Sequence, residues 1–265
     1  MKASITIIGF GRLGKLLHDM LFKAGYDQIS VIRKNDEILF LNDYIIIAVP
    51  DDNIPTVIED ISQSGLRLKS KIIAHTSGVV GLDVFSTFNQ KKVTVGCFHP
   101  LMAITETSKS FDGITFDVCG DVKFVRTIKP IIDDLDGKTL VVDDFQKATL
   151  HLAAVISSNY LVTLMGMVEE LFENSEIDQQ QIKKAMIPLM QSALRNLENQ
   201  SPSEALTGPI ARGDYETIQK HLNLLVEKTE LNRTYRRLGK ETIRLLGKES
   251  TEEIKTKLLS LFDEQ

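Results

Sequence analysis

The first half of the chain alternates short apolar runs with stretches of helical periodicity. Seven apolar runs predict strands, over residues 4–8, 29–33, 43–49, 71–75, 93–98, 113–118 and 138–142. In the run 44–49, hydrophobic and polar residues do not alternate, so we expect helices to cover both faces of that strand. Residues 52–63 place isoleucine and valine at helical spacing on one face. This alternation predicts an α/β domain with a mainly parallel sheet and crossover helices.

The pattern changes after Asp143 and Asp144. No strand-like run follows, and helical periodicity predicts helices over residues 145–174, 179–199, 214–227, 230–246 and 251–262. The sequence therefore divides into an α/β domain over residues 1–143 and an all-helical domain over residues 144–265.

Composition narrows the class of function. The 265 residues carry 31 Lys and Arg against 36 Asp and Glu, a net charge of −5, which gives no electrostatic reason to bind nucleic acid. Cys97 and Cys119 are too few for a disulfide framework and lack the spacing of metal ligands. We therefore expect no metal site, and a reducing, cytoplasmic location.

One segment raises the question of a membrane span. Residues 148–168 contain no Asp, Glu, Lys or Arg and are long enough to cross a bilayer. The segment nevertheless includes His151 and the polar run Ser157-Ser158-Asn159, which is more typical of a helix buried in a soluble assembly. We therefore expect no membrane span.

A glycine-rich turn carries the strongest functional signal. The G-x-G-x-x-G pattern of Gly9, Gly11 and Gly14 follows the first strand and opens a helix, which is the context that dinucleotide binding requires. Gly9 permits the tight turn, Gly11 lets the backbone approach a pyrophosphate, and Gly14 lets helix and strand pack closely. The turn predicts a Rossmann-like domain whose cofactor-binding residues are Gly9, Phe10, Gly11, Arg12, Leu13 and Gly14.

The end of the second strand predicts which dinucleotide binds. An acidic residue there would bind the ribose hydroxyls of NAD, whereas a basic residue would accept the additional phosphate of NADP. The sequence offers Arg33 and Lys34 and no acid at the strand end, so we expect NADP(H) to be preferred over NAD(H). The alternative is that both are solvated surface bases.

Residues at further strand ends are candidates for the same site, because ligands of parallel sheets bind beyond the carboxyl ends of the strands. Val49 and Pro50 follow the third strand, and Thr76 and Ser77 follow the fourth, so we expect them to complete the cofactor site. Ser77 could also hydrogen-bond the substrate. His99 follows the fifth strand, where an imidazole can act as a general acid or base. A loop histidine bonded to backbone carbonyls is the alternative.

The first helix of the second half carries a polar stripe. At about 100° per residue, Lys147, His151 and Ser158 fall within about 40° of one another, with Asn159 on the flank of His151. Such a stripe on an apolar helix is typical of a helix that faces a cleft or a partner. We expect His151 and Asn159 to act in catalysis and Ser158 in substrate binding. A satisfied polar network at an interface is the alternative.

Glycine and proline residues predict a loop within residues 205–217. Gly208-Pro209 and Arg212-Gly213 indicate the loop, and Asp214 is suited to cap the next helix. Arg212 could bind a carboxylate or phosphate of a substrate. The alternative is that an Arg212–Asp214 ion pair fixes the loop.

Together these segments resemble an uncharacterised Rossmann-like family with a C-terminal domain of unknown function, number 2520. The resemblance covers nearly the whole chain and is most specific from Leu206 through Thr207 to Asp214. The wider superfamily includes the 6-phosphogluconate dehydrogenase-like enzymes, pyrroline-5-carboxylate reductase and prephenate dehydrogenase. It implies a homodimer formed through the helical domain. We expect Thr207, together with Arg212, to bind the substrate.

These features predict an NADP(H)-dependent oxidoreductase. The enzyme would transfer a hydride to or from a small carbonyl or imine substrate bearing an anionic group, and either His99 or His151 would handle the proton. The alternative is a sensor that binds NADP(H) without catalysis, which needs the same glycine turn but no catalytic histidine.

Overall fold

The computed structural model describes residues 2–89, 91–247 and 250–263. It divides into two compact units, Met1–Leu161 and Val162–Gln265. The last strand in the chain is β7 (Lys138–Val141), close to the predicted strand over residues 138–142. The first unit nevertheless extends beyond Asp143, the predicted domain boundary, because helix α4 (Asp144–Ala154) packs against β6 (Thr115–Gly120).

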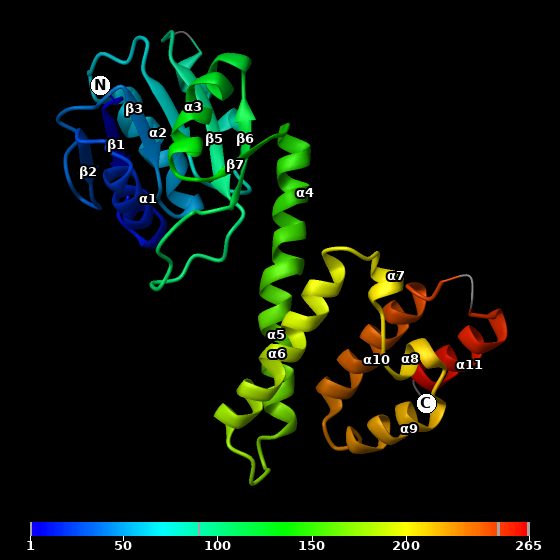
Figure 1. Ribbon diagram of the computed structural model, residues 1–265. Coiled ribbons are helices and arrows are strands. Elements are labelled where there is room, and N and C mark those ends of the chain that lie inside the picture. The colour runs from blue at the N-terminus through cyan, green and yellow to red at the C-terminus, as the bar shows by residue number, and fades with distance from the viewer. Residues whose placement is uncertain (1, 90, 248–249, 264–265) are drawn as a thin grey trace. The chain divides into compact units, whose positions relative to one another are not determined.

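A seven-stranded sheet forms the centre of the first unit, in the order β2-β1-β3-β4-β5-β6-β7 (Figure 1). The other strands are β1 (Ile5–Ile8), β2 (Ile29–Ile32), β3 (Tyr44–Ile47), β4 (Ile72–His75) and β5 (Thr94–Pro100). Every neighbouring pair is parallel except β5 with β6. The seven predicted strands and the mainly parallel sheet are confirmed. The strand order reverses beside β1, and such a switch point is where open α/β sheets bind ligands.

Helices cover both faces of this sheet. They are α1 (Arg12–Lys23), η1 (Asp51–Asn53), α2 (Ile54–Gln63), η2 (Leu82–Phe88) and α3 (Val122–Asp134). Ile46 on β3 belongs to a buried cluster with residues of α1 and α3, whereas Ile45 and Ile47 belong to a second cluster with residues of α2 and η2. Covering both faces of β3 is what its unbroken apolar run predicts.

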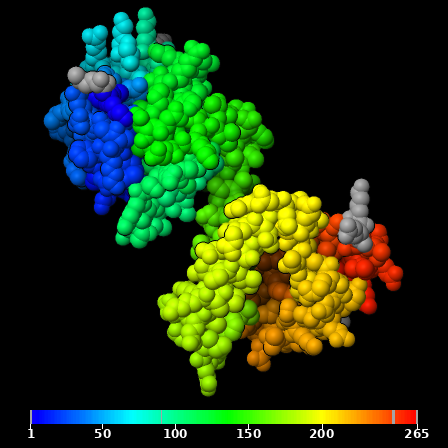
Figure 2. Space-filling view, in the orientation of Figure 1, coloured from blue at the N-terminus to red at the C-terminus, as the bar shows by residue number. Residues whose placement is uncertain are grey.

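All described elements after β7 are helical. A long helix consists of α4, a π-helical turn η3 (Val155–Asn159) and α5 (Tyr160–Leu171). It is followed by α6 (Gln179–Leu197), α7 (Pro202–Ala205), α8 (Pro209–Arg212), α9 (Tyr215–Leu224), α10 (Thr229–Arg244) and α11 (Glu252–Phe262). The short helices α7 and α8 were not predicted from the sequence. The surface of the second unit is hollowed between its yellow and orange segments (Figure 2).

Candidate active site

The glycine turn joins β1 to α1 at the switch point of the sheet. Gly9 has φ +99°, and a Cβ atom there would lie 2.4 Å from the carbonyl oxygen of Ala48. A Cβ atom at Gly14 would lie 2.1 Å from the carbonyl oxygen of Gly9. Both distances are far below van der Waals contact, so side chains are excluded at these two positions. A Cβ atom at Gly11 would meet no described atom within 4 Å, which leaves open space beside the turn.

The start of α1 is suited to an anion. Gly11 is the N-cap residue and provides no side-chain cap, and the first turn of the helix contains no acidic residue. The first backbone N–H groups of a helix lack intrahelical acceptors and carry a partial positive charge. Together with the open space at Gly11, they fit a pyrophosphate. Phe10, Gly11 and Arg12 also line a cavity of about 730 Å³ between α1 and the loop around Thr105.

Arg33, which the sequence predicts to favour NADP(H) over NAD(H), lies beside this turn. The guanidinium carbon of Arg33 lies 4.8 Å from the centre of the Phe10 ring, at cation–π distance. The backbone N–H of Arg33 donates to the Asp36 carboxylate at 2.7 Å, which shapes the turn after β2. Arg33 and Lys34 are both exposed. The ring of Phe10 thus orients one exposed cation at the end of the second strand.

The remaining cofactor candidates follow neighbouring strands. Val49 and Pro50 follow β3, and a Cβ atom at Gly9 would come within 2.8 Å of the Val49 side chain. Thr76 and Ser77 follow β4, and the Thr76 hydroxyl donates to the Ile47 carbonyl at 3.3 Å. Because β1, β3 and β4 are parallel, their carboxyl ends lie at one edge of the sheet.

His99 is held by a buried carboxylate. Its Nδ1 lies 2.8 Å from Oδ2 of Asp117, which is wholly buried, while the imidazole is 18% exposed. The two residues face each other in the antiparallel pairing of β5 with β6. A carboxylate at Nδ1 fixes the ring and leaves Nε2 for other partners. Sequence reasoning missed Asp117. Its only signal is an acid inside the apolar run 114–118.

The second predicted histidine lies next to the first. The rings of His99 and His151 have their centres 5.9 Å apart at an interplanar angle of 59°. A Cβ atom at Gly78 would lie 2.5 Å from His151 Nδ1 and 2.9 Å from His99 Cε1, so only a glycine leaves room between the rings and the loop after β4. Buried Nδ1 of His151 has no hydrogen-bond partner in the described part of the chain.

Two further residues near the histidines have roles in the fold. The Ser77 hydroxyl oxygen accepts hydrogen bonds from the backbone N–H groups of Val79, at 3.1 Å, and Val80, at 3.0 Å. His75 is wholly buried and stacks on Phe85. Burial, and after it the charge of Lys147, lowers the pKa of His75 to about 3, so this imidazole is neutral at physiological pH.

The predicted polar stripe is interrupted. Lys147 and His151 lie on regular α4, but residues 155–159 form a π-helical turn. A π turn places residues at different angles from an α-helix, so the angles predicted for Ser158 and Asn159 were wrong. The hydroxyl of neighbouring Ser157 donates to the Ala153 carbonyl at 2.8 Å. Insertions of this kind are frequent at functional sites, and periodicity alone does not reveal them.

Arg212 and Thr207 belong to the second unit and are both exposed. Arg212 ends α8, where Gly213 adopts the left-handed conformation with φ +64°. Asp214 caps α9, since its carboxylate accepts from the backbone N–H and the hydroxyl of Thr217. Those hydrogen bonds lower the pKa of Asp214 more than the charge of Arg212 does. Asp214 thus engages the helix cap, and the exposed guanidinium of Arg212 lies at the end of α8.

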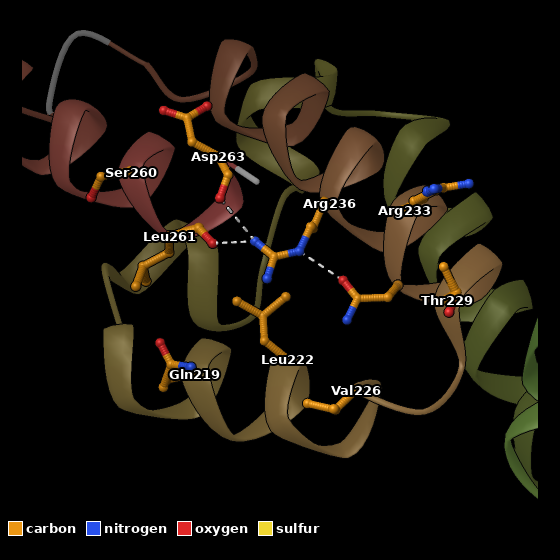
Figure 3. Close-up of a pocket in the computed structure, with 10 residues that line it drawn as sticks. Gln219, Leu222, Val226, Thr229, Arg233, Arg236, Ser260, Leu261 and Asp263 are labelled. Carbon is orange, nitrogen blue, oxygen red and sulfur yellow. Dashed lines mark hydrogen bonds between the residues drawn. The ribbon is translucent and has the colours of Figure 1, made fainter. Parts of the chain in front are cut away.

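A second cavity, of about 490 Å³, lies among α9, α10 and α11 (Figure 3). Arg236 points into it, but its guanidinium donates to the carbonyls of Leu261 and Asp263 and to the Asn232 side chain. The guanidinium thereby satisfies two backbone carbonyls at the C-terminal end of α11, those of Leu261 and Asp263. The cation of Arg236 is thus engaged by the fold, and neither Arg212 nor Thr207 lines this cavity.

Two family models match the chain. A Rossmann-like domain matches residues 28–100, and a Domain of unknown function (DUF2520) matches residues 114–242. The chain combines a Rossmann-like domain with a DUF2520 domain. The resemblance that the sequence indicated is thereby confirmed. His99 and Gly78 fall in the first match, whereas Asp117 and His151 fall in the second.

Solved structures share the whole fold. A candidate NADP oxidoreductase from Bacteroides fragilis is 22% identical, with a TM-score of 0.75 over 89% of this chain and 96% of that one. An imine reductase from Myxococcus stipitatus in complex with NADP+ is 15% identical, with a TM-score of 0.64 over 97% and 99%. Pyrroline carboxylate reductase from Plasmodium falciparum with NADP bound is 12% identical, with a TM-score of 0.61 over 99% of both chains. No curated protein matches by sequence.

Proposed function

We propose that this protein is an NADP(H)-dependent oxidoreductase acting on a small carbonyl or imine substrate that bears an anionic group. The observation that carries the proposal is the Asp117–His99 pair beside His151, in the unit that holds the glycine turn. An imidazole held by a buried carboxylate is suited to proton transfer. Structural neighbours that bind NADP and reduce imines support the choice of reaction class.

NADP(H) is the proposed cofactor. The open space at Gly11 and the uncapped start of α1 suit the pyrophosphate, and Arg33 on the Phe10 ring suits the additional phosphate of NADP. One neighbour was crystallised with NAD+, in a variant of the imine reductase. The preference for NADP(H) therefore rests here on Arg33 and on the absence of an acid at the carboxyl end of β2.

His99 is the proposed proton donor. When bound, NADPH supplies the hydride. The Nδ1–H of His99 donates to Asp117, so the imidazolium, which carries a proton on both nitrogens, would give its Nε2 proton to the substrate nitrogen or oxygen and remain as the neutral ring. His151 lies beside that ring and shares the role of orienting the reacting group. The exposed guanidinium of Arg212, with Thr207, is the proposed partner of the anionic group.

The test is turnover of NADPH with a panel of cyclic imines and 2-oxo acids. Replacing His99 by Ala should lower kcat by about 10²–10⁴-fold and leave the Kd for NADPH within about threefold. Replacing Asp117 by Asn should lower kcat less, since the imidazole remains. His221, which bonds to the Tyr235 hydroxyl at 2.8 Å in the second unit, is the matched control, and His221→Ala should keep the wild-type kcat. NADPH binding without turnover of any member would support the sensor instead.

The long helix presents apolar side chains to its surroundings. Leu152 is 59% exposed, and Ile156 and Tyr160 are each 54% exposed. The helix Asp144–Leu171 is also long and apolar enough to cross a membrane by length and composition alone. Exposed apolar area of this kind marks an interaction site.

We propose that a second copy of the chain covers this helix, rather than lipid. Lys147 and His151 of α4 are engaged by the sheet unit, because Lys147 donates to the Val80 carbonyl and His151 lies against Gly78. The rest of the helix, residues 155–171, spans only about 25 Å at about 1.5 Å per residue. A bilayer core is about 30 Å thick. Light scattering at micromolar concentration should give twice the mass of one chain, and flotation with vesicles should leave the protein unbound.

A further inference from the structure

A buried lysine lies next to the histidine pair. Lys147 has no exposed surface. Its ammonium group donates to the Val80 carbonyl oxygen at 2.8 Å, and no carboxylate lies within ion-pair distance of it among the described residues. Burying a charge without a counter-charge is costly. An apolar residue would avoid this cost, and the contact that offsets it for Lys147 is the hydrogen bond to the Val80 carbonyl.

Val80 ends a short loop that is fixed at both ends. The loop follows β4, and the Ser77 hydroxyl oxygen accepts the N–H groups of Val79 and Val80. The bond from Lys147 holds the carbonyl of Val80. In the middle of this loop, Gly78 lies against the rings of His99 and His151.

The same helix supplies the lysine and one of the histidines. Lys147 and His151 are four residues apart on α4, so their side chains lie one turn apart on one face. The hydrogen bond from Lys147 to Val80 therefore holds α4 against the loop one helical turn from the contact between His151 and Gly78. A shift of α4 along the loop would change the contact between the two imidazoles.

We propose that Lys147 is a positioning residue, which holds Gly78 against His99 and His151 through its bond to the Val80 carbonyl. The proposal rests on the proposed function for its catalytic consequence, but the contact itself can be measured without a substrate. A misplacement of about 1 Å in a catalytic group lowers the rate by about 10²-fold. Loss of the Lys147 bond should therefore lower kcat by about 10–100-fold and leave NADPH binding unchanged.

The test compares Lys147→Met with a matched control, Lys71→Met. Lys71 also donates to backbone carbonyls, of Leu41 at 2.8 Å and Asn42 at 3.0 Å, but it precedes β4 at the opposite edge of the sheet. In NMR spectra, Lys147→Met should lose the NOEs between Gly78 and both imidazoles, whereas Lys71→Met should keep them. Lys147→Met should also lower kcat at unchanged Kd for NADPH, and Lys71→Met should not.

The outcomes separate this proposal from the proposed function. If the NOEs and kcat of Lys147→Met equal those of the wild type, the positioning role is overturned. If the wild type reduces no substrate of the panel, the proposed function fails, and the NOEs still decide the role of Lys147. Should Lys147→Met not fold, Lys147→Gln is the milder variant. Its neutral side chain is one atom shorter, and the same loss of NOEs is expected.

Discussion

Alanine substitutions at two glycines of the same turn should affect different properties, NADPH binding at Gly11 and the free energy of unfolding at Gly14. Gly11 has φ −73° and ψ −166°, which alanine adopts freely, and its Cβ atom would meet nothing within 4 Å. The unfolding free energy of Gly11→Ala should thus stay within about 0.5 kcal/mol of the wild type. The new methyl group would occupy the space proposed for the pyrophosphate. We expect the Kd for NADPH to rise at least about tenfold, or about 1.4 kcal/mol.

Gly14→Ala should damage the fold itself. Its Cβ atom would lie 2.1 Å from the Gly9 carbonyl oxygen and 3.6 Å from the Ala48 side chain, so α1 would have to move away from the turn. Overpacking of this kind costs about 1–3 kcal/mol or more. Urea denaturation measures the stability of both variants, and fluorescence titration with NADPH measures binding. If Gly11→Ala binds NADPH as tightly as the wild type, the turn does not hold the pyrophosphate.

Three further predictions concern other parts of the chain. Arg33→Ala should weaken NADPH binding by about 1.5–3 kcal/mol and change NADH binding little, and equal losses for both cofactors in titrations would refute the role of Arg33. Because the pKa of His75 is lowered to about 3 in the fold, the unfolded chain takes up this proton first as the pH falls below about 6.5. Stability should therefore decline between pH 6.5 and 3, by up to about 1.4 kcal/mol per pH unit from this group. Urea midpoints for His75→Gln should show a shallower decline, and an unchanged slope would contradict the assignment. Ile156→Asp should halve the mass seen in light scattering, and a retained dimer would move the interface away from this helix face.

Much of the fold is visible in the sequence because burial is periodic. The strand β3 is an unbroken apolar run, and its isoleucines are buried on both faces of the sheet. The glycine turn is equally local, since Gly9 and Gly14 exclude side chains within a few residues of chain. Helix positions in the second half follow from the recurrence of apolar residues at helical spacing.

The candidate site could be predicted only in part. His99 and His151 were predicted separately, each from its place at the end of a strand or on a helix face. Their partners were not predicted, because Asp117 pairs with His99 through an antiparallel register between β5 and β6. The π-helical turn at residues 155–159 was also missed, because the surrounding segment is apolar on most faces and its sequence does not show where one turn is wider than the others.

The sequence by itself determined the two-part architecture, the dinucleotide turn and the individual polar residues at strand ends, because each depends on neighbours within about one turn or one strand. Only the tertiary structure decided which of those residues meet. It placed Asp117 beside His99, Gly78 against both imidazoles and the ammonium of Lys147 on the Val80 carbonyl. Such contacts join positions far apart in the chain, and their distances are set by the register of β5 with β6 and by the packing of α4 on the sheet rather than by local periodicity.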